Sequence, residues 1–234
     1  PLTINGGTLS IGNQFALGTN SVVVSNAAVV VNEANGLVSA TLGANNFAIG
    51  AFVSNQTVQL NGNAAVWTNT SNFEIGLRRA QSNQVTVANG ATLASGGSVR
   101  VGWDDGGPYR SLFNQLIVTN GSTVWLSGNA VIGDGASTNT MILVGGGGAT
   151  TSLWNNGGAN RFTIGNNGGS GNRVVVDGNG VNAGAVVTNL TSTSGTGAFT
   201  LGDSGSGGNT FTLTNGGRLF VDGSGGAVIG YGSS

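Results

Sequence analysis

The stretch FTIGNNGGSGNRVVVDG, residues 162–178, contains the two patterns that indicate the fold. The first is a pattern of four residues: an apolar residue, then any residue, then Ile, Leu or Val, and finally Gly. From Gly18 to Gly230 this four-residue pattern recurs in seven steps over 212 residues, about 30 residues per step. That period is typical of solenoids and other repeat arrays. We read its copies at residues 9–12, 15–18, 47–50, 73–76, 99–102, 130–133, 162–165, 199–202 and 227–230.

The second pattern is an Asn that stands six residues before a turn residue, with a β-rich run such as Val174-Val175-Val176 between the two. The turns are Asn-Gly or Gly-rich and tolerate positive φ, so the run between them reads as a short strand. In stacked repeats these amides would hydrogen-bond to their neighbours above and below, as in the Asn ladders of cross-β assemblies. We therefore predict a structural ladder, in preference to a ligand site, formed by Asn20, Asn55, Asn83, Asn114, Asn139, Asn172 and Asn209.

Each repeat has a second apolar patch after the turn, such as Thr123-Val124-Trp125, before the strand that ends in Gly. Three short strands in about 30 residues cannot bury a core alone, but stacked copies can. We predict an all-β parallel β-helix (β-solenoid) of about eight coils, with three short strands per coil and no α-helix, as one domain over residues 1–234. Val58 and Leu60 stand one step out of phase in the Asn55 repeat, which predicts a bulge there.

The composition excludes several classes of function. Seven Arg, no Lys and eight acidic residues give a net charge of -1, which provides no basic patch for nucleic acid. The chain has no His and no Cys, so the usual general base, thiol nucleophile and transition-metal ligands are missing. No apolar run approaches the ~18 residues of a membrane-spanning helix. We expect no cofactor, no metal and no membrane span.

Three segments resemble the passenger β-helices of bacterial autotransporters, in particular the autotransporter-associated β-strand repeats of long surface proteins. They are NGGTLSIG (5–12), IGNNGGSGNRVVVDG (164–178) and TLTNGGRLFV (212–221). The resemblance covers essentially the whole chain. It implies a right-handed β-helix in an extracellular or bacterial cell-surface setting, and it carries over no catalytic residue.

Two acidic residues deserve comparison with enzymes, because parallel β-helices also include polysaccharide lyases and hydrolases. Asp134 and Asp203 each follow a strand-end Gly and would lie two coils apart, about 9.6 Å, within the range of paired catalytic carboxylates. Acids after a Gly turn are more often solvated corner residues, and no third acid or base converges on them. We therefore predict no catalytic residue and expect that the chain is not an enzyme.

The longest insertion between repeats combines aromatic and charged side chains, as a surface for a glycan or protein partner would. It contains Trp103, Asp104, Asp105, Tyr109 and Arg110. The sequence favours a plain surface loop over a contact site, so this segment is only a candidate contact loop.

The repeat continues to both ends of the chain without a capping sequence. If residue 234 led into residue 1 of another copy, Ser233 would take the position of the repeated Asn, at a spacing that internal repeats use. Open solenoid ends offer strand edges to other chains. We expect an end-to-end interface that includes Leu2, Thr3, Ile4, Val228 and Ile229.

These observations favour a structural extracellular or cell-surface protein that stacks head to tail into a filament or long stalk. Its partner would be itself, or neighbouring repeats if the chain is a segment of a longer protein. The alternative is an adhesin-type passenger that binds glycans or surfaces along its side. A polysaccharide lyase or hydrolase is the third hypothesis.

Overall fold

The computed structural model describes residues 2–5, 7–11, 22–25, 28–31, 46–51, 54–69, 72–104, 110–146, 148, 150–155, 161–180, 184–190 and 197–231. Within these ranges every regular element is a β-strand and no helix is present. Accordingly, no helix in the described part of the chain is long and apolar enough to cross a membrane. The prediction of an all-β chain is confirmed for these residues.

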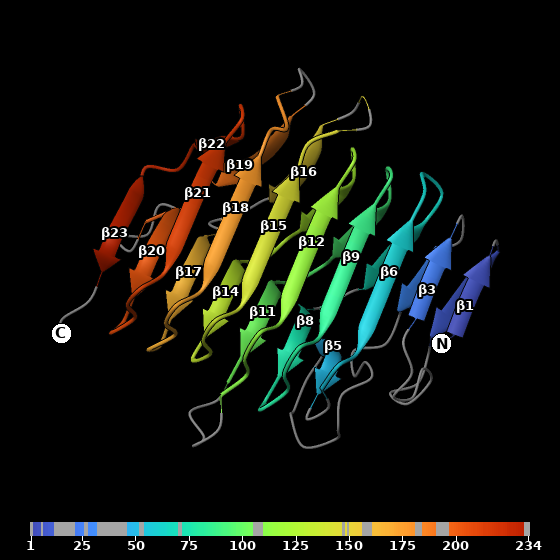
Figure 1. Cartoon of the computed structure of the whole chain (residues 1–234), viewed down its shortest axis with the longest axis horizontal. Coiled ribbons are helices and arrows are strands. Elements are labelled where there is room, and N and C mark those ends of the chain that lie inside the picture. Colours follow the sequence, from blue (N-terminus) through green and yellow to red (C-terminus); the bar gives the residue numbers. More distant parts are fainter. Residues whose placement is uncertain are drawn as a thin grey trace.

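The strands form three sheets in which every neighbouring pair is parallel (Figure 1). The first sheet has the order β1 (Leu2–Asn5), β3 (Val22–Ser25), β6 (Thr57–Asn61), β9 (Gln84–Ala88), β12 (Gln115–Thr119), β15 (Thr140–Val144), β18 (Arg173–Asp177) and β21 (Thr210–Thr214).

The second sheet has the order β2 (Thr8–Ile11), β4 (Ala28–Val31), β7 (Val66–Asn69), β10 (Thr92–Ser95), β13 (Thr123–Leu126), β16 (Thr151–Asn155), β19 (Ala185–Leu190) and β22 (Arg218–Val221). The third, in chain order, has β5 (Asn46–Ala51), β8 (Asn72–Leu77), β11 (Val99–Trp103), β14 (Ala130–Asp134), β17 (Phe162–Asn166), β20 (Phe199–Asp203) and β23 (Ala227–Tyr231).

From β3 onward the chain visits the first, second and third sheets in turn, and each strand pairs with the strand three places further along the chain. We call one such set of three strands a repeat. Parallel pairing between successive repeats is compatible with a β-helix. After one passage through the three sheets, the chain returns to the first sheet and pairs with the strand of the preceding repeat.

The strand-end Gly pattern marks the third sheet from residue 47 onward. Phe47 pairs with Phe73, Phe73 with Val99 and Val99 with Ala130, as the repeat alignment requires. The copy at residues 9–12 was assigned to the wrong strand, since Thr8–Ile11 pairs with Ala28–Val31 in the second sheet. The copy at 15–18 lies outside the described residues.

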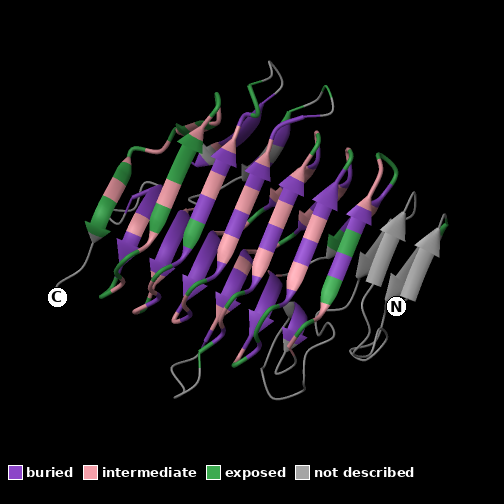
Figure 2. Cartoon of the chain, viewed as in Figure 1, coloured by how far each residue is buried: buried purple, intermediate pink, exposed green. Residues whose placement is uncertain are grey.

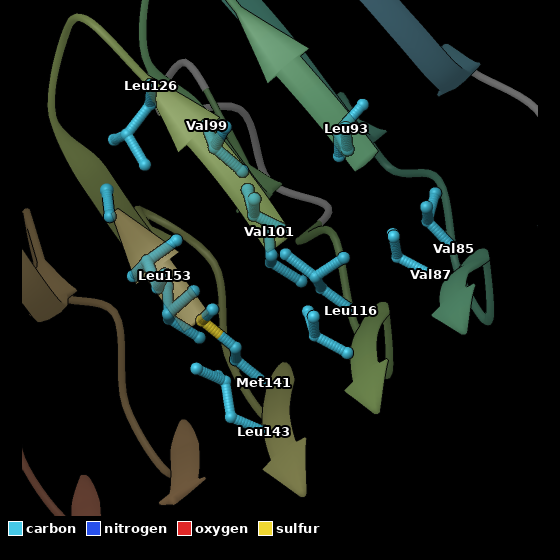
Figure 3. Packing of buried hydrophobic residues seen from close by; sticks show 14 of the residues in the cluster. Val85, Val87, Leu93, Val99, Val101, Leu116, Leu126, Met141, Leu143 and Leu153 are labelled. Atoms are coloured by element: carbon cyan, nitrogen blue, oxygen red, sulfur yellow. The ribbon is translucent and has the colours of Figure 1, made fainter. Parts of the chain in front are cut away.

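The core lies between the inner faces of the three sheets. Strands of the first sheet alternate buried and partly exposed side chains, as in Leu116, Ile117 and Val118 of β12, because successive residues point to opposite faces. Figure 2 shows the alternation along the central strands, and Figure 3 shows Leu116, Met141 and Leu143 directed toward Val101 and Leu153. One contiguous apolar cluster therefore runs through the stacked repeats.

The Asn55 repeat keeps the common register, so the expected bulge is absent there. Val58 pairs with Val85 and Leu60 with Val87 without a shift. The irregularity that the structure does contain lies between β19 and β22, around Val187 and Leu190.

Candidate functional site

An asparagine ladder joins five successive repeats just before the strands of the first sheet. The side-chain Nδ2 of each of the first four Asn residues donates to Oδ1 of the Asn in the next repeat, at 2.9, 3.0, 3.2 and 3.0 Å. The same Oδ1 also accepts the backbone N–H of the preceding Asn, at 2.9 to 3.1 Å. The residues are Asn83, Asn114, Asn139, Asn172 and Asn209.

Four of the five ladder amides are buried, and several of them make further hydrogen bonds within the protein, whereas Asn209 is partly exposed. Asn139 Nδ2 also donates to the carbonyls of Ser137 and Ser111, and Asn172 Nδ2 donates to the carbonyl of Ala136. Asn83, Asn114, Asn139 and Asn172 have no exposed surface. Buried amides with these partners stabilise the stack, as expected for a structural ladder.

The strand-end Gly leaves the space in which the ladder lies. A Cβ on Gly102 would stand 2.2 Å from Asn139 Nδ2, and one on Gly133 would stand 2.1 Å from Asn172 Nδ2. These glycines also have positive φ, 73° and 79°. Gly and Asn therefore form one structural unit, in which each Asn lies over the strand-end Gly two repeats earlier in the chain.

Two predicted ladder members differ from this arrangement. Asn55 is exposed with a φ of 61° and is not in the row; instead the backbone N–H of Gln56 donates to Asn83 Oδ1 at 2.9 Å. The count from Asn55 to Asn61 placed the repeat one residue early, because strand register follows the buried pair Val58 and Leu60. Asn20 lies outside the described residues.

The candidate contact loop is only partly a free surface. Trp103 packs against Ala48 and Leu77, and the Arg100 guanidinium carbon lies 5.0 Å from its ring. Asp104 is buried. Arg110 is exposed and donates to Ser137 Oγ and to the carbonyl of Gly168. Asp105 and Tyr109 lie outside the described residues.

The two carboxylates considered for catalysis are engaged in local hydrogen bonds. Asp134 Oδ1 accepts from the side-chain amides of Asn166 and Asn167 at 2.9 and 2.7 Å, and Asp203 Oδ1 accepts from Ser204 Oγ at 3.0 Å. Among the described residues, no three His, Cys, Asp or Glu side chains are grouped so that they could hold a metal ion.

An ion pair between a buried carboxylate and a partly exposed Arg was missed by the sequence analysis. Glu74 in β8 has no exposed surface, and its Oε1 accepts from Arg100 of β11 at 3.0 Å. Burial raises the pKa of Glu74 from 4.5 to about 7, although Arg100 opposes the shift. The two residues occupy the same position of the repeated pattern in consecutive copies, so aligning the copies at 73–76 and 99–102 could have revealed the pair.

The last repeat leaves its apolar residues exposed. Leu213 of β21 and Ile229 of β23 are 46% and 78% exposed, whereas Val176 and Ile164 in the same rows of the preceding repeats are fully buried. Val228, also in the predicted interface, is half-buried. Leu2, Thr3 and Ile4 form β1, the edge strand at the other end of the first sheet.

Comparison of the chain with known protein families, with curated proteins and with solved structures found no match. The resemblance to autotransporter passengers therefore stays an expectation from the sequence.

Proposed function

We propose that this chain is a structural extracellular or bacterial cell-surface β-solenoid whose copies stack end to end into a filament or long stalk. In this proposal the three sheets wind as a right-handed parallel β-helix of about eight coils. The observation that carries the proposal is the exposed apolar surface of the last repeat, centred on Leu213 and Ile229.

Burial of these side chains would favour association. Covering a Leu or Ile side chain contributes about 1.5 to 3 kcal/mol, and the last repeat also has half-buried Phe211 and Leu219 against the core. At the same face, β21, β22 and β23 are the last strands of their sheets and have backbone groups without a neighbouring strand.

The opposite edge offers a matching pattern. Strand pairing places Leu2 in one continuous row of residues with Phe211, and Ile4 in one row with Leu213. The paired strands of the first sheet are all parallel, so β1 of a second copy can pair in parallel with β21 and continue this sheet. Such a contact is heterologous and does not close, which produces an open fibre.

The direct test is the assembly state of the purified chain over a range of concentrations, measured by light scattering and electron microscopy. We expect elongated particles that lengthen with concentration and have the width of one chain. Ile229→Arg should prevent elongation, because it places a charge in the apolar end face. Gln59→Arg, which adds the same charge at an exposed position on the side of β6, should leave elongation unchanged.

A chain that stays monomeric at high concentration, without fibres, would contradict the proposal for this chain. Equal loss of fibres in both variants would show that added charge, and not the end face, decides assembly.

A further inference from the structure

Among the described residues, six turns contain the dipeptide Asn-Gly. Five of the six Asn residues have positive φ, between 48° and 57°, so their local backbones are closely similar. The Asn residues are Asn61, Asn89, Asn120, Asn167, Asn179 and Asn215, each followed by Gly.

Asn-Gly pairs are chemically susceptible to deamidation, because Gly has no side chain to hinder attack by its own backbone nitrogen. That nitrogen loses its proton to hydroxide and bonds to the Asn Cγ. The Cγ–Nδ2 bond then breaks as Nδ2 takes a proton from water and leaves as ammonia, which produces a cyclic imide. Addition of water to either imide carbonyl opens the ring to Asp or to iso-Asp.

In five of the six pairs the attacking nitrogen is held by the following repeat. Four Gly N–H groups donate to backbone carbonyls, Gly62 to Ala88, Gly90 to Asn120, Gly168 to Ser204 and Gly180 to Asn215, at 3.0 to 3.1 Å. Gly121 N–H donates to Thr151 Oγ1 at 2.9 Å. Each of these bonds must break before the nitrogen can lose its proton and turn toward Cγ.

The sixth pair lies at the exposed end face. Asn215 and Gly216 close the turn after β21, and among the described residues no acceptor receives the Gly216 N–H. The Asn215 side chain is otherwise held like that of Asn89: Asn215 Nδ2 donates to Asp177 Oδ1 at 3.0 Å, and Asn89 Nδ2 donates to Asn61 Oδ1 at 2.7 Å. The two sites differ in the hydrogen bonds that the following repeat provides. At Asn89, Gly90 N–H donates to the Asn120 carbonyl and to Ser122 Oγ, and Asn89 Oδ1 accepts from Asn120 Nδ2 at 2.9 Å.

We propose that Asn215 is a site of spontaneous deamidation in this chain, the most reactive of these six. The product places a second carboxylate beside Asp177, where the amide now donates a hydrogen bond. Two neighbouring carboxylates repel one another. Deamidation therefore weakens the last turn of the first sheet.

The reactivity in the dispersed chain does not depend on the proposed function, but its protection does. If a second copy continues the first sheet, its first turn supplies an acceptor for Gly216 N–H, as Asn120 does for Gly90. Deamidation at Asn215 then slows inside a filament, while the five internal sites do not change.

The test is incubation of the full chain at mildly alkaline pH and low concentration, followed by peptide mapping with mass spectrometry over time. We expect Asn215 to deamidate at least roughly fivefold faster than Asn89, the factor that loss of one typical hydrogen bond allows. Asn215→Ala should remove this signal without changing the rate at Asn89. Equal rates at Asn215 and Asn89, or a faster internal site among the six, would overturn the inference.

A second incubation at a concentration that produces filaments separates the two proposals. Slower conversion of Asn215 in filaments supports both. Rapid conversion at Asn215 in a chain that never assembles supports the modification site and contradicts the proposed function. Filaments in which Asn215 reacts as fast as in the dispersed chain contradict protection by stacking.

Discussion

At the residue scale, the fold depends on the pairing of one Gly with one Asn in each repeat. The Gly allows a positive φ at the end of a third-sheet strand and leaves room for the Asn side chain that begins the second repeat after it. The Asn fills that room and links repeats through both its amide and its backbone. Replacing the Gly would therefore displace the Asn side chain, and replacing the Asn would leave the space beside the Gly unfilled.

Replacing Asn139 by Asp should reduce stability strongly. Asp keeps the acceptor but loses the Nδ2 bonds to Asn172 and Ser137, and it introduces a charge at a buried position. We expect the free energy of unfolding to fall by roughly 3 kcal/mol or more, measured by chemical denaturation. The same change at exposed Asn89 should cost less than about 1 kcal/mol. Similar losses at both positions would contradict a special role for the buried ladder.

Replacing Gly102 by Ala should separate the effect of backbone conformation from that of space. Gly102 and Gly168 have similar φ, 73° and 79°, but an added Cβ meets Asn139 at the first and nothing within 4 Å at the second. Positive φ alone costs Ala about 1 to 2 kcal/mol. We expect Gly168→Ala to lose about that much, and Gly102→Ala to lose about 1 to 3 kcal/mol more from the clash.

Thermal and chemical unfolding of the two Gly variants provide the measurement. Equal losses would mean that Asn139 moves aside at no cost, and that the Gly is required only for its φ.

At the scale of the strand, alternation of apolar and polar residues correctly indicated which residues enter the core. It could not indicate what happens on the outer side of the third sheet. Glu74 lies between Phe73 and Ile75, which face the core, so it points to the opposite face, and yet it is fully buried. Burial on that face depends on how other segments cover the sheet, which strand periodicity does not encode.

The buried Glu74 should make stability depend on pH. Its pKa is raised in the folded protein from 4.5 to about 7, so the neutral form is favoured by folding. The contribution is fully present below about pH 4.5, falls as the pH rises and is lost above about pH 7. Arg100 and Arg78 favour the ionised form, whereas desolvation and Asp134 oppose it.

Glu74→Gln keeps the shape and removes the titration, so it should flatten the decline between pH 4.5 and 7. The check is the difference in thermal unfolding midpoint between parent and variant across that range. Parallel pH curves for the two proteins would show that Glu74 ionises in the folded state as readily as in the unfolded state.

At the scale of the whole molecule, each repeat is stabilised by its neighbours. A row of the core, such as Val85, Leu116, Met141 and Val174, is continuous through pairing from one repeat to the next. The last repeat has a neighbour on one side only, which is why Leu213 and Ile229 are exposed although residues of the same type are buried elsewhere. End-to-end stacking and protection of Asn215 are both consequences that we propose from this asymmetry.

Period and residue type in the sequence were sufficient to predict parallel strands, the third-sheet rows of Phe73 and Ile75, and most of the positions of the ladder. These features are local or strictly periodic, so they can be read by aligning one repeat on the next. Tertiary structure decided that Gln56, not Asn55, takes the ladder position, that Asp104 is buried, and that Glu74 meets Arg100. The physical reason is that register and burial depend on contacts between distant segments, which a repeating pattern does not specify.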